Sequence, residues 1–114
     1  MNIPSDNDKQ LTLARLNRHK ENFRGKGITD LRVRWKGNYM FVDVVKEEKS
    51  GMFGKFLGEN TVRGVGKVAR LEFLGPNIWK LLIYKVDINK YGPHPNFNEG
   101  TVEQCLDATA DIFF

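Results

Sequence analysis

The stretch DLRVRWKGNYMFVDVVK, residues 30–46, decides the fold. Polar and apolar residues alternate on both sides of Gly37 and Asn38, which is the pattern of two strands joined by a two-residue turn that needs positive φ. The turn fixes the register and predicts three cross-strand pairs: Arg32 with Asp43, Arg34 with Phe41, and Lys36 with Tyr39. The other side of the hairpin is apolar, so we expect it to pack on a core while the paired side forms a basic and aromatic surface.

A second hairpin is predicted over residues 67–88, where the strands KVARLEFL and IWKLLIYKVDI flank Gly-Pro-Asn. Proline is favoured at turn positions, and a three-residue loop at 75–77 sets the register. The expected pairs are Phe73 with Trp79, Leu71 with Leu81, Ala69 with Ile83, Glu72 with Lys80, and Arg70 with Leu82. The last strand is apolar on both faces and is therefore expected in the middle of the sheet.

Helices are predicted on either side of these strands. Residues 5–24 begin with cap-forming side chains from Ser5 onward and carry leucines on one face. Residues 101–113 begin with the capping-box pair Thr101 and Gln104 and carry an apolar stripe. Each helix is therefore expected to pack its apolar side on the sheet.

The order α-β-β-β-β-α predicts one α+β domain over residues 1–114. We expect a four-stranded, mainly antiparallel sheet with the helices packed on one face. The glycine-rich residues 47–66 indicate either a loop or a small accessory hairpin. Residues 89–99 contain two prolines and indicate a loop.

The composition bounds the class of protein. With 114 residues, 40% hydrophobic and 28% charged, the chain is typical of a globular domain and not of a disordered protein. A single cysteine, Cys105, excludes an intramolecular disulfide and is expected to be buried. No apolar run is long enough to cross a membrane, and the first residues lack a secretory pattern. These features favour a cytoplasmic location and predict no membrane partner.

Residues 63–73, RGVGKVARLEF, contain Gly64, Gly66 and Ala69 in the spacing G-x-G-x-x-A of dinucleotide-binding loops. That motif needs a strand before the glycines and a helix after them, whose N-terminal amides meet the pyrophosphate. Here an alternating strand pattern follows Ala69 and no helical period does. We therefore expect these glycines to mark the entry into a strand and not to bind a nucleotide.

Few residues suit metal or covalent chemistry. The chain has two histidines, one cysteine and two serines, which form neither a set of metal ligands nor a nucleophile–base pair. His19 is expected to be a solvated helix residue. The carboxylates of Asp43 and Glu72 face Arg32 and Lys80 in the predicted registers and are expected to form ion pairs. We therefore expect no metal, no cofactor and no catalysis.

Positive charge is concentrated in the first part of the chain. Residues 1–70 hold 15 Lys and Arg against 8 Asp and Glu, whereas residues 71–114 hold 3 against 6. The candidate nucleic-acid-binding residues, gathered on one sheet face, are Arg32, Arg34, Lys36, Tyr39, Phe41 and Arg70. Cations for phosphates and rings for base stacking are what single-stranded nucleic acid requires. The first hypothesis is therefore a non-catalytic module that binds a polyanion such as single-stranded nucleic acid.

Other interpretations stay open at this point. Arg34 over Phe41 and Lys36 over Tyr39 would be cation–π pairs on a plain surface. The face is also apolar enough to be covered by a second copy of the chain, which predicts a homodimer and a protein-interaction module. A separate hypothesis is a small-ligand or enzymatic pocket between sheet and helices, lined by Trp79, Tyr84, Tyr91 and His94.

Residues 67–114 contain an Arg-Leu-x-Phe strand, a short turn before Trp, an aliphatic strand ending in Tyr, and a Gly-Thr-x-Glu helix start. The residues of this pattern are Arg70, Leu71, Phe73, Trp79, Tyr84, Tyr91, Gly100, Thr101 and Glu103. In this pattern the chain resembles small uncharacterised bacterial proteins that share a domain of unknown function. The resemblance implies a bacterial protein and the same strand-turn-strand-helix fold, but no activity or cofactor, and it does not extend to residues 47–66.

Overall fold

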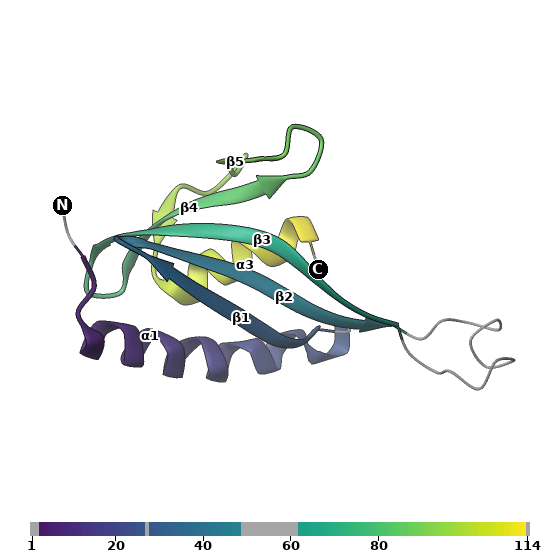
Figure 1. Ribbon diagram of the computed structural model, residues 1–114, viewed down its shortest axis with the longest axis horizontal. Coiled ribbons are helices and arrows are strands. Elements are labelled where there is room, and N and C mark those ends of the chain that lie inside the picture. The colour runs from purple at the N-terminus through teal and green to yellow at the C-terminus, as the bar shows by residue number, and fades with distance from the viewer. Residues whose placement is uncertain (1–2, 27, 49–61, 114) are drawn as a thin grey trace, which may run out of the picture.

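The computed structural model describes residues 3–26, 28–48 and 62–113. In chain order its elements are helix α1 (Asp6–His19), 3-10 helix η1 (Lys20–Lys26), strands β1 (Ile28–Lys36), β2 (Tyr39–Glu48), β3 (Val62–Gly75), β4 (Ile78–Lys85), β5 (Lys90–Pro93) and β6 (Glu99–Gly100), and helix α3 (Val102–Phe113). The strands form one antiparallel sheet in which β1 to β5 lie side by side in chain order (Figure 1). The α+β class and the antiparallel sheet are therefore confirmed.

The β1–β2 hairpin has the predicted register, with Arg32 opposite Asp43, Arg34 opposite Phe41 and Lys36 opposite Tyr39. The turn residue Gly37 has φ 59°. The φ angle of Asn38 is not positive. Only the first turn position therefore needs a glycine, as in a type II′ turn.

The β3–β4 hairpin also has the predicted register, including Phe73 opposite Trp79 and Arg70 opposite Leu82. The predicted three-residue loop was wrong, because the turn is Pro76 and Asn77 alone. A β-bulge between Phe73 and Gly75 supplies the extra residue and restores the register.

The sheet has two short strands more than the four predicted. β5 pairs with β4 through Tyr84 and Tyr91, and β6 pairs with β4 through Trp79 and Gly100. Both strands lie within residues 89–99 or at their edge, where a loop was predicted. Strands of four and two residues are too short to show an alternating pattern. β4 thus lies between β3 and β5, as its two apolar faces indicated.

The ends of the glycine-rich segment belong to long strands. β2 continues to Glu48 and β3 begins at Val62, and these two residues are paired. Gly64 and Gly66 lie inside β3, and the strand continues through Ala69, which confirms that the G-x-G-x-x-A spacing is not followed by a helix. The remainder of the predicted loop or accessory hairpin, residues 49–61, lies outside the described residues.

Both helices begin with capping boxes. In α1 the Asp8 amide donates to Ser5 Oγ at 3.1 Å, and the Ser5 amide donates to Asp8 Oδ2 at 3.0 Å. In α3 the Gln104 amide donates to Thr101 Oγ1 at 3.2 Å, as predicted. The α-helical part of the predicted helix 5–24 ends at His19, and its last residues form the 3-10 helix η1 instead.

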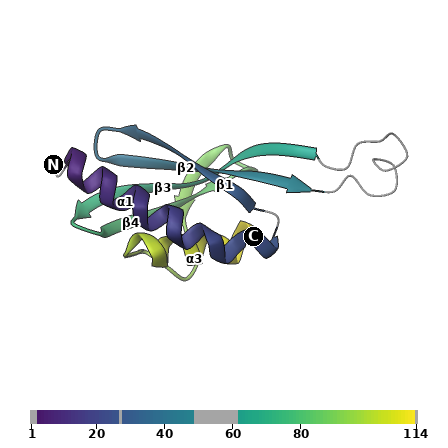
Figure 2. The same ribbon diagram turned by 90° about the horizontal axis from the view of Figure 1, so that it is seen from below.

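Both helices lie on the same side of the sheet (Figure 2). The largest fully buried side chains come from this layer and are Trp79, Leu16, Met40, Leu71, Leu81 and Leu106. Trp79 is 0% exposed and packs edge-on against Phe73, with the ring centroids 5.2 Å apart. Among the described residues, no helix combines the length and apolarity needed to cross a membrane.

Candidate nucleic-acid interface

The side of the sheet away from the helices carries the predicted cations and rings. The strand registers place on it a set that we call the basic-aromatic face: Arg32, Arg34, Lys36, Tyr39, Phe41, Asp43, Lys67, Arg70, Glu72, Lys80, Leu82, Tyr84 and Tyr91. All six candidate nucleic-acid-binding residues belong to this face. Lys67 and Tyr91 join it because of the bulge in β3 and the unpredicted strand β5.

Four aromatic rings converge on this face. The centroids are 6.4 Å apart for Tyr39 and Phe41, 5.7 Å for Phe41 and Tyr91, and 5.2 Å for Tyr91 and Tyr84. Phe41 lies on β2 and Tyr91 on β5, and strands separated by two others lie roughly 14 Å apart in a flat sheet. The ring contact therefore shows that the side chains on this face lean together above β3 and β4.

Arg34 is held by an aromatic ring and by a carboxylate. Its guanidinium carbon lies 5.2 Å from the centre of the Phe41 ring, and Nη2 donates to Asp43 Oδ1 at 3.2 Å. The hydrogen bond to Asp43 raises the pKa of Arg34. Asp43 was expected to pair with Arg32, which lies directly opposite. The structure corrects this to the diagonal neighbour Arg34, since diagonal residues of an antiparallel pair are within reach of a long side chain.

Arg70 lies against two tyrosine rings. Its guanidinium carbon is 4.6 Å from the centre of the Tyr39 ring and 5.6 Å from that of Tyr91. Nε of Arg70 is buried and has no hydrogen-bond partner within the described residues. Stacking alone thus places a half-buried cation near the centre of the face.

The other rings and cations extend the face along the strands. Lys67 Nζ lies 5.5 Å from the centre of the Tyr84 ring, and the Tyr84 hydroxyl donates to Asn89 Oδ1. The exposed side chains of Arg32 and Lys36 form no ion pair with a described residue. They lie on β1, an edge strand of the sheet.

Tyr91 is a neutral phenol in this setting. Burial raises its pKa above the usual value, and the charge of Asp43 acts in the same direction, while Arg34 opposes both.

The predicted pairing of Glu72 with Lys80 is present in the register, but the structure shows no ion pair between these two described residues.

The four residues of the predicted ligand pocket do not come together. Trp79 is buried in the core on the helix side, whereas Tyr84 and Tyr91 are on the basic-aromatic face. Residues 79 and 84 differ by an odd number along β4, so their side chains point to opposite faces.

His94 holds the segment after β5 on α3. Its Nδ1 accepts from the Asn96 amide at 2.9 Å, so Nε2 carries the hydrogen and donates to the Ala108 carbonyl, also at 2.9 Å. Both ring nitrogens are used within the fold. The geometry therefore gives His94 a structural task, with no nitrogen left for a ligand.

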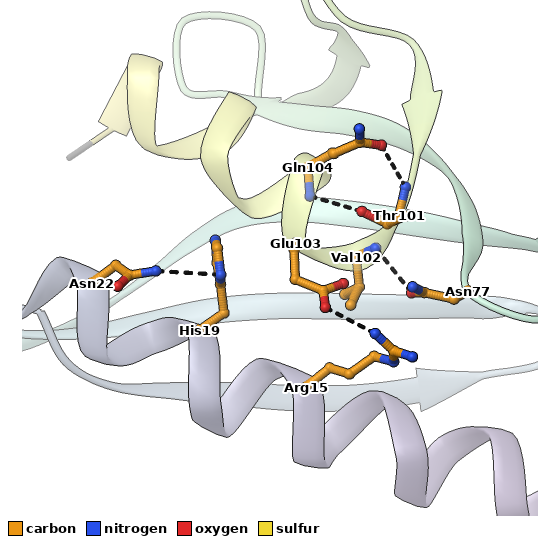
Figure 3. A network of polar contacts seen from close by, with 8 residues as sticks. All are labelled: Arg15, His19, Asn22, Asn77, Thr101, Val102, Glu103 and Gln104. Carbon is orange, nitrogen blue, oxygen red and sulfur yellow. Dashed lines mark hydrogen bonds and ion pairs between the residues drawn. The ribbon is translucent and has the colours of Figure 1, made fainter.

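A polar groove lies between α1 and α3, and no pattern in the sequence predicts it. Figure 3 shows Arg15 Nη1 donating to Glu103 Oε2 at 3.0 Å. One turn further along, His19 Nε2 lies 2.7 Å from Asp107 Oδ1. The expectation that His19 is solvated was therefore wrong, because α3 packs beside it and leaves its side chain 17% exposed.

Two hollows of about 230 Å³ each adjoin the Arg15–Glu103 pair. Burial alone would raise the pKa of Glu103, but its own backbone amide and Arg15 outweigh burial and hold the pKa below its usual value. The first hollow is lined by Asp8, Leu11, Thr12, Arg15, Pro76 and Asn77, and the second by Arg15, Arg18, His19, Asn22 and Glu103. The pairs Arg15–Glu103 and His19–Asp107 cross this groove and join the two helices.

Cys105 is buried at 0% exposure, and burial raises its pKa to about 12. Its thiol therefore stays protonated and shielded, which suits a core residue and not a nucleophile. The part of the chain that the structure describes contains no group of three or more metal-ligating side chains.

The chain matches no protein-family model, no curated protein and no solved structure. The resemblance of residues 67–114 to uncharacterised bacterial proteins stays a prediction. The geometry of the basic-aromatic face is therefore the basis for a functional proposal.

Proposed function

We propose that the protein is a non-catalytic binding module that takes single-stranded nucleic acid on its basic-aromatic face. The observation that supports this most is the cluster of Tyr39, Phe41, Tyr84 and Tyr91, with guanidinium groups stacked on three of the four rings. Both helices pack on the other side of the sheet. Neither helix therefore stands between a strand of nucleic acid and the side chains of the basic-aromatic face.

The charges of the face suit a polyanion. Its cations are Arg32, Arg34, Lys36, Lys67, Arg70 and Lys80, and its carboxylates are Asp43 and Glu72. Phosphate groups attract such a surface at long range and make the affinity depend on salt. Bases that stack on exposed ring surface add about 1–3 kcal/mol each and do so for any sequence.

Titration with a labelled single-stranded oligonucleotide at two salt concentrations tests the proposal. If about four phosphates are contacted, raising the salt from about 50 to about 200 mM should weaken binding about 50-fold. Lack of binding at the lower salt would refute the proposal. A double-stranded oligonucleotide of the same sequence is the control, because its bases are not free to stack.

Two substitutions separate charge from stacking. Arg32→Gln removes an exposed, unpaired cation and should make the salt dependence shallower. Phe41→Leu removes a ring but no charge, and should weaken binding with the salt dependence unchanged. Arg34 is unsuitable for this purpose, because its removal would leave Asp43 unpaired.

A homodimer through the same face is the main competing proposal, supported by the half-buried Phe41 and Leu82 beside the tyrosines. Light scattering over a wide concentration range separates the two. A monomer at all concentrations excludes the dimer. A dimer that dissociates when oligonucleotide is added shows that the second protomer and the oligonucleotide bind the same surface.

A further inference from the structure

Arg70 differs from the other arginines of the described residues in how it is held. Arg15, Arg24 and Arg34 form ion pairs with carboxylates, and Arg18 and Arg32 are unpaired within the described residues but exposed to water. The Arg70 side chain is half-buried between two tyrosine rings, and no hydrogen bond or ion pair joins that side chain to a described residue. It is thus a fixed cation whose charge is not neutralised within the described part of the fold.

The physical cost of this arrangement points to a ligand. A partly desolvated charge without a counterion is unfavourable, and a buried donor without an acceptor adds to the cost. Stacking uses the flat face of a guanidinium and leaves its N–H groups pointing outward in the plane, where they match the oxygens of one phosphate group. Arg34 satisfies Asp43, so that the nearest carboxylate on the neighbouring strand is already neutralised.

We propose that Arg70 is a phosphate-binding residue of the basic-aromatic face and that it takes one phosphodiester group of a single strand in a bidentate contact. This rests on the function proposed above and makes it specific, because it assigns different tasks to two neighbouring arginines. Arg70 contacts the ligand, while Arg34 positions Phe41 and Asp43. The rings of Tyr39 and Tyr91 fix the orientation of Arg70.

Fluorescence anisotropy with a labelled oligothymidine of about 12 nucleotides tests this inference, since single-strand binders cover about 4–16 nucleotides. Arg70→Lys keeps the charge but loses the planar fork, and is expected to bind at least 10-fold more weakly. Arg18→Lys, on helix α1 on the other side of the sheet, is the matched control and should bind within twofold of the wild type. Arg70→Gln should also lower the slope of log affinity against log salt by about 0.7, the share of one phosphate on a single strand.

An abasic strand of the same length identifies the group that Arg70 contacts. If it is the phosphate, Arg70→Lys should weaken binding of the abasic strand by the same factor. Binding of Arg70→Lys within twofold of a binding wild type would overturn the assignment and leave the proposed function standing. A wild type that does not bind at low salt would instead overturn the proposed function.

A measurement on the wild type covers the case in which the variants fail to fold. The Nε–H resonance of Arg70, assigned in a ¹⁵N-labelled protein, is expected to shift on saturation with the oligothymidine. The Nε–H resonance of Arg24, which is paired with Glu21 on η1, should not. An unmoved Arg70 resonance at saturation contradicts the inference.

Discussion

The rings of Phe41 and Tyr91 lie 5.7 Å apart, although β3 and β4 separate the strands that carry them. This contact joins the inner strand β2 to the edge strand β5. It also brings the Tyr91 ring to within 5.6 Å of the Arg70 guanidinium. The pair is therefore a structural support of the face as well as a part of its surface.

A double-mutant cycle on this pair should show direct coupling. Phe41→Leu and Tyr91→Leu should each lower the free energy of unfolding in urea. The double variant should lose less than the sum of the two, by about 0.5–1.5 kcal/mol, the energy of an aromatic pair beyond its buried area. Additive losses would show that the rings touch without stabilising each other.

Replacing His94 should destabilise the protein. His94→Ala leaves the Asn96 amide and the Ala108 carbonyl without their partners, and each partly or fully buried polar group so abandoned costs about 1–3 kcal/mol. Urea denaturation should show a loss of at least 2 kcal/mol. Asn96→Ala keeps its backbone amide and serves as the control. A loss for His94→Ala below about 0.5 kcal/mol would contradict the structural role.

The Arg15–Glu103 pair should make stability depend on acid pH. The pKa of Glu103 is lower in the folded protein than its value of 4.5 as a free side chain, so its contribution is complete above that value and is lost as the pH falls below it. Glu103→Gln should therefore be less stable than the wild type at pH 6 by about 0.5 kcal/mol, as exposed pairs are. This difference should shrink as the pH falls below 4.5, as measured by urea denaturation. If the stability difference between the two proteins instead grows towards acid pH, the result contradicts a lowered pKa of Glu103.

Cys105 should be inert in the folded protein. Its thiol is buried and has a pKa of about 12, so at pH 8 the thiolate needed by a disulfide reagent is scarce and shielded. Labelling with Ellman's reagent should be complete at once in concentrated urea, but in buffer it should proceed only as fast as the fold opens. Rapid labelling in buffer would show that the helix α3 is not packed as described.

The registers of both long hairpins were predictable because they follow from local patterns. Gly37 marks a turn, and the alternation around it assigns each side chain to a face. Around Pro76 the predicted loop was one residue too long, but the bulge between Phe73 and Gly75 gives the same register. The first turn of α3 was predictable from Thr101 and Gln104 for a similar reason. Each of these signals lies within a few residues of the feature that it predicts.

Features that depend on distant parts of the chain were not predictable. The contact of Tyr91 with Phe41 needs the strand β5, whose four residues carry no periodic signal. The pairing of His19 with Asp107 depends on the angle at which α1 packs against α3. The local sequence of neither helix encodes that angle. The grouping of Trp79 with Tyr84 failed for a simpler reason, since strand alternation alone separates them.

The ion pair Arg15–Glu103 and the hydrogen-bonded pair His19–Asp107 each join α1 to α3 across 88 positions of the chain. The β-meander between them is built from strands that follow one another in the chain, and its longest connection is residues 49–61, whereas the contact between the helices closes a far longer loop. We therefore expect the meander to form early and α1 to dock only after α3 has emerged from the ribosome. Until then the apolar side of α1, with Leu16 at its centre, stays accessible to chaperones.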